Sequence, residues 1–192
     1  MDLRCFIAVE IPGSLKAKIG ELIDLLKKSG ADVKWVKKEN VHVTLKFLGN
    51  TGESSVGEIK NSLTRKLSHY EPFYIRISGT GTFPAGRFPK VIWIGMARSE
   101  MLDRIHKTVE EEMAGLGYKS EERSFSPHLT IGRVRSNKMI NELLKKIDEM
   151  RSVVFGDLGI SGISVMKSEL KPAGPEYERL AEIKFVGRDN VG

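Results

Sequence analysis

Residues 41–48 read VHVTLKFL and residues 126–134 read SPHLTIGRV. Each stretch holds the pattern His-x-Thr inside a short run of apolar residues, which is typical of a β-strand. In an extended strand, side chains two positions apart project from the same face. The first stretch therefore predicts a strand with His42 and Thr44 on one face and apolar side chains in a core on the other.

The second stretch predicts the same arrangement for His128 and Thr130. Imidazole is the side chain whose ordinary pKa lies nearest neutrality, and two of them can serve as base and acid in one reaction. Threonine hydroxyls beside them can donate hydrogen bonds to phosphate oxygens. Two such pairs indicate acid–base chemistry on a phosphate ester without a metal.

The other two histidines lie in different contexts. His106-Lys107-Thr108 also has the pattern, but apolar residues recur around it at helical spacing after Ser99, a candidate N-cap. Residues i and i+2 do not face each other on a helix, so His106 is expected at a helix surface or boundary. His69 lies near a helix end before a proline and is expected to be exposed.

The chain has 192 residues and a net charge of +6. This length allows one good core, or two small lobes that share an interface. No apolar stretch approaches the roughly 20 residues of a membrane span, and the first residues lack the features of a secretory signal. Cys5 is the only cysteine, which fits a cytoplasmic protein. The positive charge favours anionic partners, nucleic acid first.

Predicted strands and helices alternate along the chain, and their order recurs. The expected strands are residues 4–11, 41–48, 73–78, 91–96, 126–134, 153–155, 160–166 and 178–186. The expected helices are residues 14–29, with Ser14 as its cap, and 56–67, 99–116 and 140–147.

His42 and His128 lie 86 positions apart, and shifting the first half by this interval places strand on strand and helix on helix. We therefore predict an α+β fold of two duplicated β-α-β-α-β units. They would form two lobes, with two antiparallel sheets facing a central cleft and helices outside. No Pro/Ser-rich linker separates the halves, so residues 1–192 are expected to form a single domain, with 79–89 as the main irregular loop.

Other chemistries fit the residues less well. Two histidines and two threonines offer too few good metal ligands, and neither motif carries the Asp or Glu that usually completes such a set. The sequence lacks the G-x-S-x-G elbow of serine hydrolases and the glycine-rich fingerprints of nucleotide-binding loops. We expect neither a metal nor a cofactor.

The chain resembles the two-histidine (2H) phosphoesterase superfamily, and specifically its RNA 2′,3′-cyclic phosphodiesterase family, also called 2′-5′ RNA ligase. The matching stretches are residues 4–9 with Pro12, 41–49, 81–84, 91–95, 125–133 and 174–177. The resemblance implies a bilobal α+β fold and no metal requirement. It also implies hydrolysis of a 2′,3′-cyclic phosphate at an RNA end to a 2′-phosphomonoester, together with reversible 2′-5′ RNA ligation.

The resemblance further implies the roles of the motif residues. His42 would be the proton donor to the departing 3′ oxygen, and His128 the proton acceptor that activates water. Thr44 and Thr130 would hold the phosphoryl oxygens. The expected partners are RNA ends or nucleotides with a 2′,3′-cyclic phosphate, not a membrane, and the chain is expected to be a monomer.

Arg133 follows the second motif and is a candidate phosphate-binding residue. In a regular strand it would face away from Thr130, although Gly132 could allow a bulge that changes this. Lys46 would share the His42 face, where it could contact an RNA backbone or be an ordinary solvated lysine. Four aromatic residues are expected in the core, namely Trp35, Phe47, Phe83 and Trp93.

Two alternatives remain open on the sequence. One is a nucleotide-binding or RNA-binding module of the same fold without turnover, and the other is a structural protein with two incidental motifs. A matched acid and base are not needed for binding alone, which favours the enzyme. Hydrolysis of a nucleoside 2′,3′-cyclic phosphate would distinguish the enzyme from both.

Overall fold

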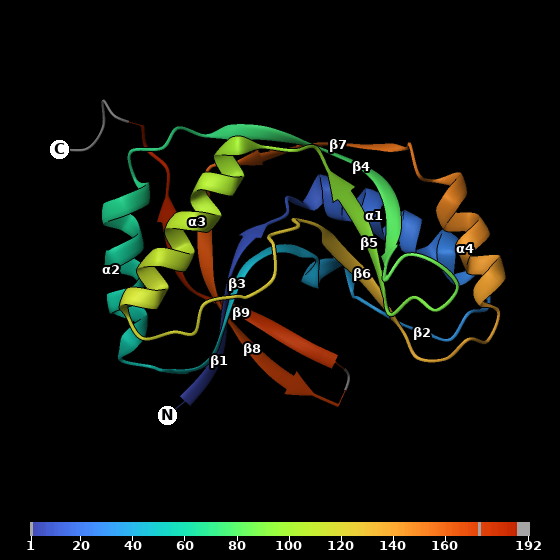
Figure 1. Cartoon of the computed structure of the whole chain (residues 1–192), viewed down its shortest axis with the longest axis horizontal. Helices are drawn as coiled ribbons and strands as arrows, with labels where there is room; N and C mark the ends of the chain where they lie inside the picture. Colours follow the sequence, from blue (N-terminus) through green and yellow to red (C-terminus); the bar gives the residue numbers. More distant parts are fainter. Residues whose placement is uncertain (1, 173, 188–192) are drawn as a thin grey trace.

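The computed structural model describes residues 2–172 and 174–187. Within these residues, nine strands form one antiparallel sheet and four α-helices pack on it (Figure 1). The strands are β1 (Asp2–Glu10), β2 (Val33–Trp35), β3 (His42–Gly52), β4 (Phe73–Phe83), β5 (Val91–Met96), β6 (Leu129–Val134), β7 (Val154–Ile160), β8 (Gly162–Lys171) and β9 (Gly174–Lys184). The helices are α1 (Gly13–Lys27), α2 (Ser55–Leu67), α3 (Glu100–Gly115) and α4 (Ile140–Glu149), with a 3-10 turn, η1 (Lys38–Asn40).

The strand order is β7-β4-β5-β6-β3-β1-β8-β9, with β2 added beside β6. The α+β class and the helices predicted from the sequence are confirmed, but the two predicted sheets are one. They join where β3 pairs with β6 through Val43 and Leu129. We call β3, β1, β8 and β9 the His42 lobe, and β6, β5, β4, β7 and β2 the His128 lobe.

The two halves of the sequence exchange elements between these lobes, so the local β-α-β-α-β units predicted from the repeat are not the lobes. β4 from the first half pairs with β5 and β7, whereas β8 from the second half pairs with β1. β4 and β5 are consecutive strands with a short connection, and such strands pair readily as a hairpin. The hairpin carries β4 into the His128 lobe.

The helices are exchanged in the same way. α1 contacts β7 and α4, and α3 contacts α2 and β3. Figure 1 accordingly shows α2 with α3 at one end of the molecule, and α1 with α4 at the other. Each lobe is therefore covered by one helix from each half of the chain.

The core lies between the sheet and the helices. Apolar stripes on all four helices pack with alternate residues of the strands in one hydrophobic cluster. We call this side of the sheet the helix face. In α1, for example, Leu15, Ile19 and Leu22 are buried, as their spacing of three to four residues predicts.

Local signals in the sequence located one of three element ends correctly. The Ser99 side chain caps α3 by accepting a hydrogen bond from the Leu102 N–H at 3.2 Å. Ser14 does not cap α1, which starts at Gly13 after Pro12. The predicted irregular loop at 79–89 is also shorter, because β4 continues to Phe83.

Candidate active site

Both His-x-Thr motifs lie on the same face of the sheet, on neighbouring strands. Val43 of β3 pairs with Leu129 of β6, and both side chains are fully buried in the core. Because side chains alternate along a strand, the residues on either side of this pair project from the opposite face. Those residues are the two histidines and the two threonines. We call this side of the sheet the motif face.

The two histidine rings are oriented in the same way. The Nδ1–H of His42 donates to the carbonyl oxygen of Asn40 at 2.7 Å, and that of His128 donates to the carbonyl oxygen of Ser126 at 2.7 Å. A carbonyl oxygen can only accept, so the hydrogen of each neutral ring is on Nδ1. In both rings, Nε2 is left as the atom that can take up or deliver a proton.

The surroundings of the two rings differ. The His42 ring lies 4.8 Å from the ring of Phe6 and 5.2 Å from that of Tyr177. Burial among these groups lowers the pKa of His42, against the hydrogen bond to Asn40, which raises it. The His128 ring meets the ring of Phe83 edge-on at 5.2 Å.

A β-bulge follows the first motif. Thr44 is opposite Ala8 and Lys46 is opposite Ile7, so Leu45 is an extra residue in β3. The bulge turns Lys46 to the helix face, where its side chain is fully buried. The prediction that Lys46 shares the His42 face is therefore wrong, and both roles left open for it there, an RNA contact and a solvated lysine, fall with it.

The same bulge brings Phe47 to the motif face. Phe47 lies opposite Phe6, and it is 59% exposed instead of lying in the core. Phe83 is also exposed, and Trp93 stands opposite Thr130 on the motif face. Trp35, which packs against the core, is where it was predicted to be.

A matching bulge in β6 decides the position of Arg133. Thr130 is opposite Trp93 and Arg133 is opposite Val91, with Ile131 as the extra residue. Trp93 and Val91 are two residues apart and share a face, so Arg133 shares the face of Thr130. Gly132 lies at this bulge, and a Cβ there would lie 2.8 Å from the Val33 side chain. The structure thus brings all five predicted site residues to one face.

Tyr177 on β9 is a site residue that the motif analysis missed. Its ring lies 5.1 Å from that of Phe6, beside His42. Burial raises the pKa of Tyr177, and the charges of Arg133 and Arg4 lower it by less. The phenol is thus a neutral hydrogen-bond donor beside His42, close enough to Arg133 and Arg4 for their charges to affect it. In the sequence, its only signal was the stretch at residues 174–177.

A pocket of about 300 Å³ opens beside His42. Its polar lining includes Glu10, whose Oε1 accepts hydrogen bonds from the Ser164 hydroxyl at 2.6 Å and from Arg179 at 3.3 Å. Lys16 and Tyr177 also line it. The pocket therefore offers both acceptors and donors within reach of His42.

The part of the chain that the structure describes contains no group of three or more His, Cys, Asp or Glu side chains that could hold a metal. None of its helices is long and apolar enough to cross a membrane.

Fold and site together define the class of two-histidine phosphoesterases, in which neighbouring strands of a bilobal protein each present a His-x-Thr pair. The family model of the 2′-5′ RNA ligase superfamily matches residues 14–169, and the chain belongs to this superfamily.

Curated relatives extend over nearly the whole chain. It is 38% identical to the RNA 2′,3′-cyclic phosphodiesterase of Methanothermobacter thermautotrophicus, over 92% of this chain and 96% of that protein. It is also 38% identical to the enzyme of the same name from Methanocaldococcus jannaschii, over 94% and 99%.

Solved structures agree with the fold. The protein TT0787 of Thermus thermophilus is similar with a TM-score of 0.80 at 26% identity, covering 96% of this chain and 98% of that one. E. coli LigT in complex with 3′-AMP is similar with a TM-score of 0.75 at 18% identity, covering 97% and 99%.

Proposed function

We propose that this protein is an RNA 2′,3′-cyclic phosphodiesterase that hydrolyses a terminal cyclic phosphate to a 2′-phosphomonoester. The observation that carries the proposal is the pairing of Val43 with Leu129, because it gives both His-x-Thr motifs one face. The names of relatives that share 38% of their residues with almost the whole chain support the choice of substrate.

In this mechanism His128 is the base and His42 the acid. The Nε2 of His128 takes a proton from water, and the water oxygen forms a bond to phosphorus. The bond between phosphorus and the 3′ oxygen breaks, and the Nε2–H of protonated His42 delivers its proton to that oxygen. Exchange of protons with solvent then restores both rings. The hydrogen bonds from Nδ1 to Asn40 and Ser126 keep the two Nε2 atoms available for these transfers.

The remaining polar groups of the motif face would bind the phosphate. Thr44 and Thr130 can donate to its non-bridging oxygens, and Arg133 can offset the negative charge that develops on them. In this proposal Tyr177 supplies a further neutral donor near the leaving oxygen. All of these groups are fixed on strands, which suits a site that must hold phosphorus in line between two rings.

The assignment of acid and base also orients the substrate. The 3′ oxygen belongs to the same ribose as the cyclic phosphate, so the terminal nucleoside must lie on the His42 side. The pocket beside His42, with Glu10 and Arg179, is the space we assign to the terminal nucleoside.

In ligation, a 5′-hydroxyl would take the place of water beside His128 and form a 2′-5′ bond, with the same roles for both rings. Cleavage of that bond would exchange the roles.

One chain supplies both motifs, so the proposed site needs no second copy, and we propose that the protein acts as a monomer. The single cysteine, Cys5, is buried as a free thiol. A reduced thiol supports our proposal that the enzyme works in the cytoplasm.

The proposal is tested with a synthetic RNA that ends in a 2′,3′-cyclic phosphate, incubated with the protein in the presence of EDTA. We expect a product with a 2′-phosphate, identified by chromatography against 2′- and 3′-phosphate standards. A 3′-phosphate product would overturn the assignment of the leaving oxygen. Binding of the RNA without hydrolysis would indicate a binding module, and activity that requires an added metal would contradict the two-histidine mechanism.

A further inference from the structure

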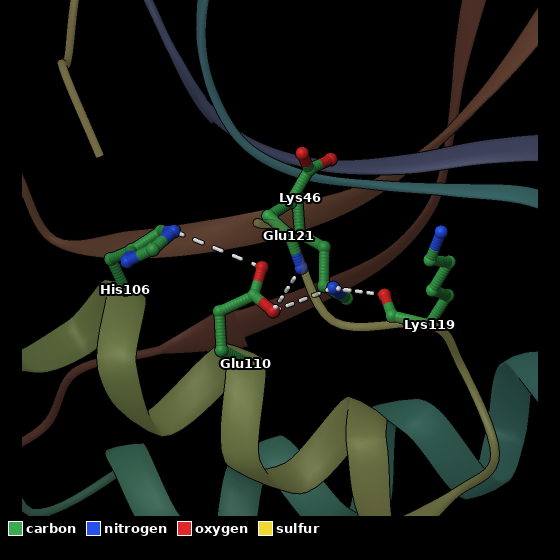
Figure 2. Close-up of polar contacts among 5 residues, drawn as sticks. All are labelled: Lys46, His106, Glu110, Lys119 and Glu121. Atoms are coloured by element: carbon green, nitrogen blue, oxygen red, sulfur yellow. Dashed lines mark hydrogen bonds and ion pairs between the residues drawn. The ribbon is translucent and has the colours of Figure 1, made fainter. Parts of the chain in front are cut away.

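A largely buried polar cluster on the helix face links the first motif strand, through α3, to the loop that precedes the second motif. It consists of Lys46 on β3 with His106 and Glu110 on α3 (Figure 2). The Lys46 Nζ donates to Glu110 Oε2 at 2.8 Å and to the carbonyl oxygen of Lys119 at 2.8 Å. Burying a lysine is costly unless it is paired and hydrogen-bonded, so the contacts of Lys46 need an explanation.

The cluster holds the loop that leads into the second motif. Glu110 Oε2 also accepts a hydrogen bond from the backbone N–H of Glu121 at 3.2 Å. Further along, the ring of Phe125 stacks on that of His106, with ring centres 3.8 Å apart. His106 Nε2 in turn lies 3.8 Å from Glu110 Oε1. The next residue after Phe125 is Ser126, whose carbonyl oxygen accepts the Nδ1–H of His128.

Comparison with the other half of the chain shows what the cluster replaces. The segment before His42 contains β2, which is held by backbone pairing to β6 at Gly132 and Arg133. Residues 119–121 stand 86 positions after β2, but the structure assigns them to no strand. Residues 119–127 make no backbone–backbone hydrogen bond in the described structure. Side-chain contacts therefore hold residues 119–121, whereas backbone pairing with β6 holds the equivalent strand β2.

The residues at the bulges explain this difference. Lys46 and Gly132 are also 86 positions apart, and each follows the extra residue of its bulge. Gly132 leaves room for Val33 and Trp35 of β2, whose side chains a Cβ would meet at 2.8 and 3.1 Å. At the equivalent place in β3, the lysine side chain extends and reaches the loop.

We propose that Lys46, Glu110 and His106 are positioning residues for His128. By holding the loop at 117–127, they keep the Ser126 carbonyl oxygen where it fixes the Nδ1–H tautomer of His128. This inference rests on the proposed function only where it predicts a fall in kcat. The position of the loop and the tautomer of His128 are properties of the free protein.

The first test uses two single variants, Lys46→Met and Glu110→Gln, and observes the imidazole nitrogens of each by NMR. In the wild type, both His42 and His128 should show the Nδ1–H tautomer. In either variant we expect His128 to become a mixture of tautomers, while His42 stays unchanged as an internal control. A His128 signal identical to that of the wild type in the folded variants would overturn the proposal. This readout stands even if the protein has no activity on cyclic phosphates.

The second test is kinetic, with a nucleoside 2′,3′-cyclic phosphate as substrate. For Lys46→Met and for Glu110→Gln we expect kcat to fall by about 10- to 100-fold with little change in KM. A misplaced His128 would lose reactivity as a base more than the site would lose substrate binding. Thr80→Val is the matched control, because the Thr80 hydroxyl donates a buried hydrogen bond to Ile147 at 2.6 Å, away from the loop. It should lower thermal stability and leave kcat unchanged. A Lys46→Met variant that behaves like this control would show a structural role only.

His106→Ala keeps the proposal testable if the variants of Lys46 and Glu110 do not fold. The His106 side chain is partly buried in the middle of α3, and its removal takes away the surface on which Phe125 stacks. We expect the same loss of a single His128 tautomer and the same fall in kcat. If the folded His106→Ala variant kept the wild-type tautomer of His128 and the wild-type kcat, the proposed chain of contacts would be contradicted.

Discussion

At the level of single residues, the site is built from two equivalent sets of groups with unequal surroundings. His42 and His128 each donate through Nδ1 to a carbonyl oxygen two residues earlier, which gives both rings the same tautomer. The aromatic rings of Phe6 and Tyr177 then desolvate His42. Two chemically identical side chains can thereby take different roles, since a buried ring gives up its proton more readily.

Replacing either motif histidine should abolish most of the activity. We expect His42→Ala and His128→Ala each to lower kcat/KM by about 10²- to 10⁴-fold, because general acid–base catalysis contributes a factor of this size. Hydrolysis of a nucleoside 2′,3′-cyclic phosphate and circular dichroism check activity and folding together. His69→Ala is the control, since His69 is exposed outside the site. Activity in a motif variant close to that of this control would contradict the mechanism.

The pH dependence should reflect the lowered pKa of His42. The proposed acid must be protonated, so activity falls as pH rises through the pKa of His42. Because burial places this pKa below the ordinary value of 6.5, the alkaline fall of kcat/KM should lie at lower pH than an unperturbed histidine would give. Phe6→Ala, which opens one side of the ring to water, should move that limb to higher pH. An unchanged alkaline limb would show that another group is the acid.

At the level of the strands, two bulges determine which side chains reach the motif face. The extra residues Leu45 and Ile131 reverse the alternation after each motif. Lys46 is consequently turned into the core, whereas Arg133 joins Thr130. A bulge is a matter of pairing between strands, and the sequence of a single strand does not reveal it. This is why the face of Lys46 was predicted wrongly and that of Arg133 stayed open.

Removing the charge of Arg133 should weaken phosphate binding. We expect Arg133→Met to raise KM and to lower kcat/KM by about 10-fold or more, as loss of a hydrogen bond to a charged group typically costs about 1.5–3 kcal/mol. Steady-state kinetics at low salt measure the effect. Arg151→Met removes an equal charge at the end of α4, where Arg151 pairs with Asp148, and should change kinetics little. Equal effects of Arg133→Met and Arg151→Met would indicate only a general attraction of the substrate to the positive charge of the protein.

Over the whole molecule, the lobes are built from exchanged parts. The His42 lobe holds α3 and β8 from the second half of the chain, and the His128 lobe holds α1 and β4 from the first. Neither half can therefore complete a lobe without the other. We propose that the chain is one cooperative domain, even though its sequence is a repeat of elements.

This proposal predicts a single unfolding transition. Trp35 and Trp93 both lie in the His128 lobe, so tryptophan fluorescence reports on that lobe, while far-UV circular dichroism reports on all helices. Leu63→Ala removes a fully buried side chain from α2 in the other lobe and should cost about 2–5 kcal/mol of unfolding free energy. Both denaturation curves should shift together. A shift in circular dichroism alone would mean that the lobes unfold separately.

Much of this protein could be predicted from local sequence patterns. Apolar periodicity located most of the strands and all four helices, and the two His-x-Thr pairs identified the motif strands, because side-chain direction follows directly from a period of two or 3.6. Pairing between strands far apart in the sequence determined the remaining features of the fold and the site. It joined two sheets into one, exchanged elements between lobes, added the short strand β2, introduced the bulges and brought Tyr177 of β9 beside His42. These features depend on contacts between distant segments, whose energies no stretch of neighbouring residues contains.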